Sequence, residues 1–324
     1  MTTDSAKSAT RAGDGDGIAR PLSTVDVSKT QPRDFEGEVS TNDELLSKKT
    51  IARIENYPIL DRDGHPRPFG KLYRGAGTTR RTLFIFIRHF YCGNCQEYLR
   101  AIAQSIPPET LATIPISTSI VVIGCGDPAL IDMYAETTNW PYAIFTDPSG
   151  SLFHELGMVK TLALGKRPVY MKTSLVTSTI YSIGQALRAV PQGLALKSGD
   201  QRQVGGEFLF EPLTMTRPGH APREVSSSPL GLLEGAKEDE DEEKRLTWCH
   251  RMKTTRDHAE IPELMEVLGL EGHGEPLPDQ KRWLEALRSR KGTGSTMAPQ
   301  IRQLRRACAE QKRMAEEDDA RGEE

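Results

Sequence analysis

Long hydrophobic runs are missing from this sequence. No apolar stretch approaches the ~20 residues that a membrane-spanning helix needs, which excludes a spanning segment. The N-terminus has no apolar core preceded by basic residues, there is no Asn-x-Ser/Thr acceptor, and the five cysteines are an odd set, so nothing indicates secretion. Acidic residues at Asp4, Asp14 and Asp16 argue against a mitochondrial transit peptide. We therefore expect a soluble protein of a reducing compartment, the cytoplasm or alternatively the nucleus.

A strong excess of one charge is also missing. The 42 basic and 45 acidic residues leave a net charge of −3, so we expect neither a nucleic-acid partner nor a membrane partner. Only 37% of the residues are hydrophobic whereas 27% are charged, which is a low apolar share for a chain of 324 residues that is packed throughout. One core domain with long tails fits this composition better than two domains.

Composition shifts along the chain predict where that domain begins and ends. Residues 1–41 are rich in Ser, Thr, Gly and Asp, and are predicted to be a disordered tail. The core domain is expected over residues 42–270, with an acidic flexible insertion at 213–244 that contains the run Glu238–Glu243. Residues 271–324 are expected to form a charged tail that is partly helical or disordered.

The centre of the domain is predicted where an apolar strand meets two cysteines. Leu83–Ile87 is an unbroken run of bulky apolar residues, typical of a parallel strand covered on both faces. Arg88, His89 and two aromatic residues follow it, and then comes Cys92-Gly93-Asn94-Cys95, where apolar residues begin to recur at helical spacing. Two thiols are therefore expected at the start of a helix.

This placement has chemical consequences for the two thiols. The unpaired N–H groups and partial positive charge of a helix N-terminus stabilise a thiolate, and Cys92 is the more N-terminal of the two. With two intervening residues the sulfurs are near enough to form a disulfide. Arg88 is expected to lower the pKa of Cys92 or to hold a polar substrate, with a solvated charge as the alternative. For His89 a structural role is favoured over proton exchange.

Other interpretations of the cysteines stay open. Cys92 and Cys95 could be half of a zinc site, but the remaining Cys/His pair, Cys249-His250, lies on a predicted strand that points the two side chains to opposite faces. They could also be two inert buried thiols. Cys125, at the end of a predicted strand, could resolve or modulate the pair, although an inert role is favoured, and Cys308 is expected to be an exposed thiol of the tail.

The apolar runs that follow predict an α/β fold. Ser119–Gly124 and Tyr142–Phe145 are predicted strands, and each is followed by an Asp-Pro step typical of a helix start, at Asp127 and Asp147. Together with the first strand and its helix they form a β-α-β-α-β pattern, which predicts parallel strands joined by right-handed crossovers.

Elements on both sides of this pattern complete the expected fold. A helix near residues 45–54 and a small hairpin formed by residues 59–61 and 69–74 are predicted to precede it. Gly205–Phe210 and Arg245–His250 are predicted antiparallel strands. Asp257-His258-Ala259-Glu260 has a capping-box pattern before a last core helix. We therefore expect a central mixed sheet flanked by helices.

Three segments resemble a known family. Phe86–Leu99, which contains both cysteines of the pair, Gly199–Phe208 and Trp248–Met252 are similar to the peroxiredoxin-like-2 branch of the alkyl hydroperoxide reductase and thiol-specific antioxidant (AhpC/TSA) family. The resemblance covers roughly residues 45–270. It implies a thioredoxin-like fold and an antioxidant oxidoreductase in which Cys92 and Cys95 match the family's paired cysteines. It implies no nucleotide cofactor and no metal.

Two positions differ from related groups. Typical peroxiredoxins precede the peroxide-attacking cysteine with Pro-x-x-x-Thr/Ser-x-x-Cys, whereas His89 stands three residues before Cys92 and Cys92 stands three before Cys95. Thioredoxins place a proline before the strand that faces the disulfide, whereas Val204-Gly205-Gly206 occupies that place here.

The sequence thus predicts a thiol oxidoreductase that reduces peroxides or disulfides. Cys92 is expected to attack, Cys95 to resolve, and Arg88 to assist, with thioredoxin or glutathione as candidate reductants. Two alternatives stay open. One is a redox-inactive interaction protein that uses the same body as a scaffold, and the other is a reductase of a small endoperoxide-type metabolite.

Overall fold

A computed structural model of the chain describes most of the predicted core domain. The described residues are 43–75, 77–168, 170–171, 184–185, 187, 190–191, 193–212, 243–270, 292–294 and 296–322. They all belong to one unit, Pro32–Glu324. The predicted N-terminal tail and residues 213–242 of the predicted acidic insertion lie outside the described residues, so both stay predictions.

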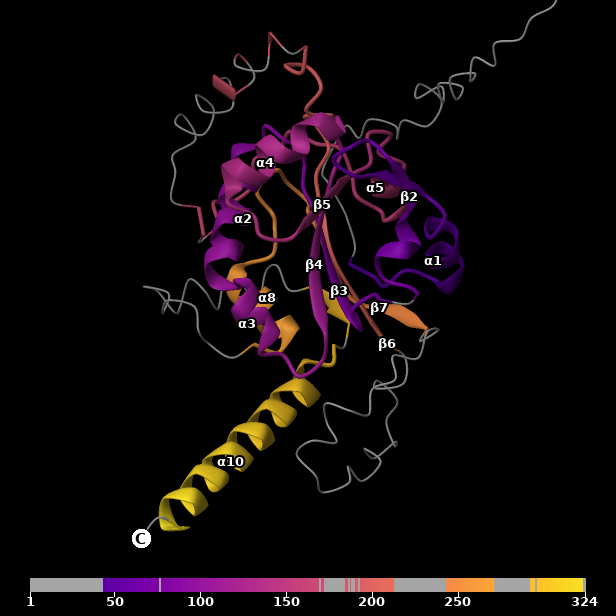
Figure 1. The fold of residues 1–324 in the computed structure, drawn as a ribbon. Helices are drawn as coiled ribbons and strands as arrows, with labels where there is room; N and C mark the ends of the chain where they lie inside the picture. Colours follow the sequence, from indigo (N-terminus) through magenta and orange to yellow (C-terminus); the bar gives the residue numbers. More distant parts are fainter. Residues whose placement is uncertain are drawn as a thin grey trace, which may run out of the picture. The chain divides into compact units, whose positions relative to one another are not determined.

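The described strands form a single mixed sheet (Figure 1). Its order is β2-β1-β5-β4-β3-β6-β7-β8, in which β3 and β5 each pair parallel with β4, while β6 pairs antiparallel with β3 and with β7. This confirms the predicted β-α-β-α-β pattern followed by an antiparallel pair. The bounds are β1 (Pro58–Leu60), β2 (Pro66–Pro68), β3 (Arg81–Phe86), β4 (Thr118–Gly124), β5 (Ala143–Thr146), β6 (Gly206–Pro212), β7 (Lys244–Arg251) and β8 (Thr293–Gly294).

Helices cover both faces of this sheet, and each face has its own apolar core. Figure 1 shows one group of helices on one side of the sheet and α1 and α5 on the other. The first group consists of α2 (Gly93–Ser105), α3 (Pro108–Ala112), α4 (Ile131–Thr138) and α8 (Ile261–Leu268). On the other face lie α1 (Lys48–Ile54) and α5 (Ser151–Glu155). Every residue of β3 is buried, as its unbroken apolar run predicted.

One strand and two helices start at other residues than the sequence predicts. The second hairpin strand is Pro66–Pro68, because Phe69–Leu72 turns into a 3₁₀ helix. After Asp127, a 3₁₀ turn at Pro128–Leu130 comes before α4. Helix α5 starts at Ser151 rather than directly after Asp147, since the Asp147 carboxylate accepts hydrogen bonds from the backbone N–H groups of residues 149, 150 and 152 and so holds a turn there.

Described residues between 292 and 301 also pack on the sheet. β8 pairs antiparallel with β7. Met297 and Ile301, which stand before and within α10 (Ala298–Gly322), are fully buried in the core that contains α2 and α8. None of the described helices is both long and apolar enough to cross a lipid bilayer.

A buried ion pair ties this C-terminal part to the centre of the sheet. Arg81 and Glu211 both have fully buried side chains, and an Arg81 Nη2–Glu211 Oε1 distance of 2.7 Å joins β3 to β6. The Arg81 guanidinium also donates to the carbonyl oxygens of Val267 and Leu268 at the end of α8. Glu211 accepts from the Thr247 hydroxyl at 2.6 Å and from the backbone N–H of residue 297. Each charge is therefore paired and further hydrogen-bonded, as burial requires.

Replacing Arg81 with Met should lower the free energy of unfolding by about 3–5 kcal/mol, because Glu211 would be left as an unpaired buried carboxylate. Urea unfolding measures this loss. The matched control is Arg62→Met, since the Arg62–Asp132 pair has both side chains 61% exposed and should contribute less than about 1 kcal/mol. Equal losses in the two variants would contradict the assignment.

Candidate functional site

The end of β3 brings Arg88, Cys92 and Cys95 together. Residue 87 still pairs with β4 through its N–H, and the chain then turns sharply, with the Cys92 N–H donating to the His89 carbonyl at 3.0 Å. Cys92 is the N-cap residue of α2 and Cys95 lies in the first turn of that helix. Cys92 is 4% exposed and Cys95 is fully buried, and both are free thiols.

Arg88 contacts the sulfur of three cysteines. Its Nη1 donates to Cys92 Sγ at 3.3 Å, and its backbone N–H donates to Cys95 Sγ at 3.4 Å. Its carbonyl oxygen accepts from the Cys125 thiol at 2.7 Å. Arg88 therefore lies among the sulfurs, whereas the alternative of a solvated charge is wrong, because its side chain is only 7% exposed.

The loop before β6 holds this guanidinium in place. Arg88 Nη2 donates to the Gln201 carbonyl at 2.6 Å and Nε donates to the Gln203 carbonyl at 3.3 Å. The loop passes β3 so closely that a Cβ on Gly205 would lie 1.8 Å from the Phe86 carbonyl oxygen. Only glycine fits at this crossing, at the place where thioredoxins have proline.

The two thiols of the pair have opposite pKa shifts. A hydrogen bond from Cys95, followed by the positive charge of Arg88, holds the pKa of Cys92 well below its usual value despite burial. Burial, together with the neighbouring Cys92 sulfur, raises the pKa of Cys95 well above its usual value. At neutral pH the arrangement therefore favours a Cys92 thiolate beside a Cys95 thiol, which is the protonation state that a nucleophile and a waiting second thiol require.

His89 is a buried neutral group. Burial lowers its pKa to about 4, and its Nδ1 has no hydrogen-bond partner within the described residues. A proton-exchange role at neutral pH would require a pKa near 7, so the favoured structural interpretation agrees with this environment.

The structure adds two residues that the sequence analysis did not assign to the site. His258 Nε2 lies 3.3 Å from Cys95 Sγ, and His258 Nδ1 lies 2.7 Å from Glu207 Oε1. The capping-box expectation for residues 257–260 is wrong: Glu260 is the N-cap of α8 and makes no side-chain cap hydrogen bond. The signal that could have indicated the pair is the charged Glu207 directly before the apolar residues Phe208, Leu209 and Phe210 of β6.

Cys249 and Cys308 lie apart from the thiol pair, whereas Cys125 contacts the Arg88 carbonyl. Cys249 packs in the core on the α1 and α5 face, and its thiol donates to the Asp43 carbonyl. It therefore cannot complete a zinc site with the cysteines at α2, which belong to the core of the opposite face. Burial raises the pKa of Cys125 to about 12, which favours the inert role expected for it. Cys308 is exposed on α10.

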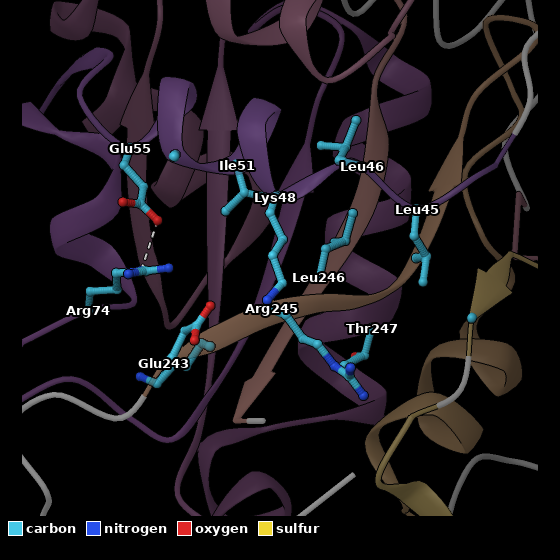
Figure 2. Close-up of a pocket in the computed structure, with 13 residues that line it drawn as sticks. Leu45, Leu46, Lys48, Ile51, Glu55, Arg74, Glu243, Arg245, Leu246 and Thr247 are labelled. Atoms are coloured by element: carbon cyan, nitrogen blue, oxygen red, sulfur yellow. Dashed lines mark ion pairs between the residues drawn. The ribbon is translucent and has the colours of Figure 1, made fainter. Parts of the chain in front are cut away.

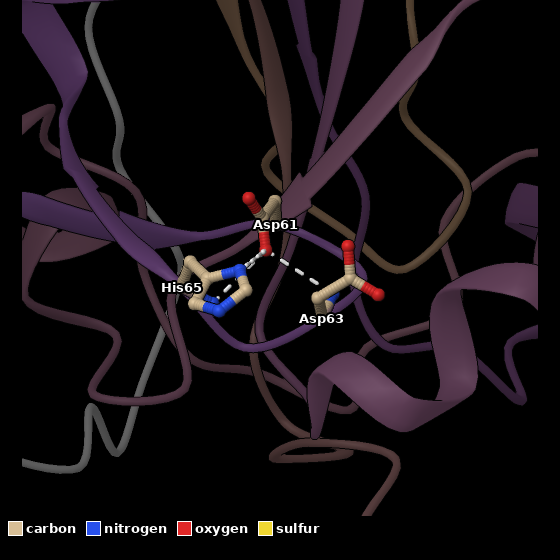
Figure 3. Close-up of side chains that lie close together, drawn as sticks. All are labelled: Asp61, Asp63 and His65. Atoms are coloured by element: carbon tan, nitrogen blue, oxygen red, sulfur yellow. Dashed lines mark hydrogen bonds and ion pairs between the residues drawn. The ribbon is translucent and has the colours of Figure 1, made fainter.

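A group of potential metal ligands occurs in the β1–β2 hairpin. Asp61, Asp63 and His65 have ligand atoms within 4.8 Å of one another. Figure 3 shows that the three side chains lie close together. However, Asp61 Oδ1 accepts the backbone N–H of residue 63 at 3.1 Å and of residue 65 at 2.9 Å, and its Oδ2 accepts from Arg67. These bonds stabilise the turn and account for the position of the carboxylate without an ion.

A pocket of about 700 Å³ lies between α1 and β7 (Figure 2). Its apolar floor includes Ile51 and Leu246, which belong to the core of the α1 and α5 face. At its rim Arg74 forms an ion pair with Glu55 at 2.8 Å. None of the cysteines lines this pocket, so it is separate from the thiol site.

Comparison with known proteins places the chain in a family. A family model described as AhpC/TSA antioxidant enzyme matches residues 101–216, a segment that begins after the cysteine pair. Peroxiredoxin-like 2C from Bos taurus is 30% identical over 163 residues, which are 50% of this chain and 67% of the bovine protein. The Homo sapiens protein of the same name is also 30% identical, with 68% of its length covered. The chain belongs to the AhpC/TSA family, in its peroxiredoxin-like 2 branch.

Solved structures of related proteins are more distant. A mutant of peroxiredoxin 6 from Arenicola marina aligns with 71% of this chain and 72% of its own at 12% identity, with a TM-score of 0.37. Peroxidoxin BcpB from Mycobacterium tuberculosis aligns with 34% of this chain and 66% of its own at 20% identity, with a TM-score of 0.27. The sheet order described above, within this family, confirms the predicted thioredoxin-like fold.

Arg88→Met should raise the pKa of Cys92, because it removes the positive charge that favours the thiolate. Thiolate is the form that reacts with iodoacetamide, so the pH midpoint of Cys92 alkylation should move upward, and at pH values below the midpoint alkylation should slow by about tenfold for each pKa unit of the shift. Mass spectrometry of the Cys92 peptide across a pH series measures the midpoint.

The matched control for this experiment is Arg100→Met. Arg100 lies on α2 itself, and its Nε donates to the Thr137 carbonyl at 3.0 Å instead of to a sulfur. The control should keep the alkylation midpoint of the unmodified protein. An unchanged midpoint in Arg88→Met would show that Arg88 does not activate Cys92.

Proposed function

We propose that this protein is a thiol-dependent antioxidant oxidoreductase that reduces peroxides or disulfides through Cys92 and Cys95. The observation that carries the proposal is the contact between Arg88 Nη1 and Cys92 Sγ at the N-terminus of α2, with the Cys95 thiol in the first turn of the same helix. Membership in a family described as antioxidant enzymes supports the same reaction class.

The first step is nucleophilic attack by the Cys92 thiolate. On a disulfide, the sulfur of Cys92 bonds to one substrate sulfur and the other leaves as a thiolate. On a peroxide, the sulfur takes one oxygen to become a sulfenic acid, and the remaining alkoxide or hydroxide takes up a proton. The Arg88 guanidinium, which donates to Cys92 Sγ, stabilises the attacking thiolate.

The second step is resolution by Cys95. Its sulfur attacks Cys92 Sγ and releases either a second substrate thiol or water, and the Cys92–Cys95 disulfide remains. A thiol reductant such as thioredoxin or glutathione then restores both thiols. Only small movements are needed, because the two cysteines are separated by two residues within one helical turn. We place this reaction in the cytoplasm, with the nucleus as the alternative.

Mass spectrometry of the full-length protein after exposure to peroxide, or to a small disulfide, tests this function. The unmodified protein should lose two hydrogens per chain and regain them when thioredoxin or glutathione is added. Cys92→Ser should abolish the change, and Cys95→Ser should stop at a sulfenic acid or a mixed disulfide on Cys92.

The control is Cys308→Ser, which changes an exposed thiol far along α10 and should behave as the unmodified protein. Free thiols that stay unchanged in the unmodified protein would contradict the proposal and favour the redox-inactive scaffold. Full oxidation and recovery in Cys92→Ser would contradict the assignment of Cys92.

A further inference from the structure

The contact between His258 and Cys95 belongs to a buried chain of three groups. Glu207 and His258 have fully buried side chains, and the distance from His258 Nδ1 to Glu207 Oε1 is 2.7 Å. Burying a carboxylate and an imidazole in a core costs free energy unless they pair with each other and with further partners. Glu207 lies in β6 directly before the apolar residues Phe208, Leu209 and Phe210. Packing of this strand in the core does not by itself require a charged residue at position 207.

The pair presents a defined nitrogen atom to the sulfur. A carboxylate only accepts hydrogen bonds, so Nδ1 of His258 carries the proton that Glu207 accepts. In the neutral imidazole, Nε2 is then an acceptor, and it lies 3.3 Å from Cys95 Sγ. The ring is fixed in this orientation by stacking on Tyr98, with a centroid distance of 4.3 Å and an interplanar angle of 13°.

We propose that Glu207 and His258 form a relay that removes the proton from Cys95 during the resolving step. The inference rests on the function proposed above and names the residues that complete it. His258 is a catalytic residue because Nε2 touches the reacting thiol. Glu207 is a positioning residue, because it acts through His258 by fixing the tautomer and by stabilising the imidazolium.

The proposed step balances as follows. The Cys95 S–H bond breaks and its proton moves to His258 Nε2, which gives an imidazolium beside the Glu207 carboxylate. The Cys95 sulfur forms a bond to Cys92 Sγ, and the bond from Cys92 to the substrate sulfur, or to the sulfenic oxygen, breaks. The leaving thiolate or hydroxide then takes a proton, so that the net products are a disulfide and a thiol or water. The reverse transfer would reprotonate Cys95 during reduction.

Burial explains why Cys95 requires a base. Its environment keeps the thiol protonated at neutral pH, and a thiol is a poor nucleophile. Once Cys92 has reacted, it is no longer a negative charge next to Cys95, so the thiolate of Cys95 becomes easier to form at the moment when it is needed.

Other titratable groups also face the relay. They are Arg88 after β3, Tyr98 on α2, Tyr134 on α4, His250 on β7, Glu263 on α8, and Tyr170. Burial raises the pKa of Tyr98 and of Tyr134 well above its usual value. Although burial opposes it, Asp43 and the nearby carboxylates raise the pKa of His250 to about 9. These three groups therefore keep a constant charge near neutral pH.

Reaction of the reduced full-length protein with dithiodipyridine separates the two steps. Attack by Cys92 releases one thiopyridone and resolution by Cys95 releases a second, so the absorbance rises in two phases. All variants carry Cys308→Ser, which removes the exposed thiol. Absence of the first phase in the parent protein would defeat the proposed function, and the relay with it. A normal first phase isolates the relay as the only claim under test.

His258→Asn is the main variant. Its amide nitrogen takes the approximate place of Nδ1 and can still donate to Glu207, whereas the base Nε2 is removed. The second phase should slow by about 10²-fold at pH 7, and the first should change by less than about twofold. In the variant the second rate should also rise by about tenfold per pH unit, because hydroxide must replace the lost base. Glu207→Gln keeps an acceptor for Nδ1 and should slow the second phase by about tenfold.

Tyr134→Phe is the matched control. Tyr134 is a buried residue of the core that contains Cys92 and Cys95, but its hydroxyl stays neutral and has no hydrogen-bond partner within the described residues, so the substitution changes no charge. Both phases should stay within about twofold of the parent protein. The relay is wrong if His258→Asn and Glu207→Gln resolve at the parent rate and pH slope, or if Tyr134→Phe slows the second phase as much as they do. Should His258→Asn fail to fold, Glu207→Gln alone decides between these outcomes.

Discussion

The buried guanidinium of Arg88 is the constraint on which the thiol site depends. Arg88 is only 7% exposed, so its positive charge requires nearby partners. These partners are two backbone carbonyls of the loop before β6 and the sulfur of Cys92. Because that loop and the end of β3 hold Arg88 from two sides, a negative charge on Cys92 is favoured. Replacement of either loop contact by water would weaken the same preference, so the backbone of residues 201–203 is as much part of the site as the side chains are.

The difference between the two cysteines follows from their positions in α2. Cys92 is the N-cap residue, where the partial positive charge of the helix N-terminus and the Arg88 side chain act on its sulfur. Cys95 lies three residues further along, in the first turn of α2, where the backbone N–H of Arg88, the ring of His258 and the Cys92 sulfur are the neighbours of its sulfur. The two cysteines of this four-residue motif therefore have different surroundings. Their opposite pKa shifts follow from these surroundings, since the two side chains are chemically identical.

Much of the fold and half of the candidate site could be predicted from the sequence. The apolar run of β3, the Asp-Pro steps and the cysteines at a helix start are local signals that depend on neighbours in the chain. The contact of Glu207 with His258 joins residues 51 positions apart, and no periodicity reports such a distance. The Asp-His-Ala-Glu pattern even indicated a helix cap instead. Hydrogen bonds between neighbouring residues of the chain compete with hydrogen bonds to residues distant in sequence. Here His258 is fully buried and pairs with the distant Glu207.

The two buried glutamates of β6 show how a structural charge differs from one available to chemistry. Glu211 pairs with Arg81 and accepts from Thr247 and from the backbone N–H of residue 297, so its partners belong to the framework and none is a reactive group. Glu207 pairs with a histidine whose second nitrogen ends on a thiol. A charge network without a reactive group only stabilises the fold, whereas a network that ends at a thiol provides a path for that thiol's proton. Since His89 is buried and neutral, the proposed function assigns activation of Cys92 to Arg88 and deprotonation of Cys95 to His258. Because each sulfur has its own partner group, Cys92 can stay ionised while Cys95 stays protonated until the resolving step.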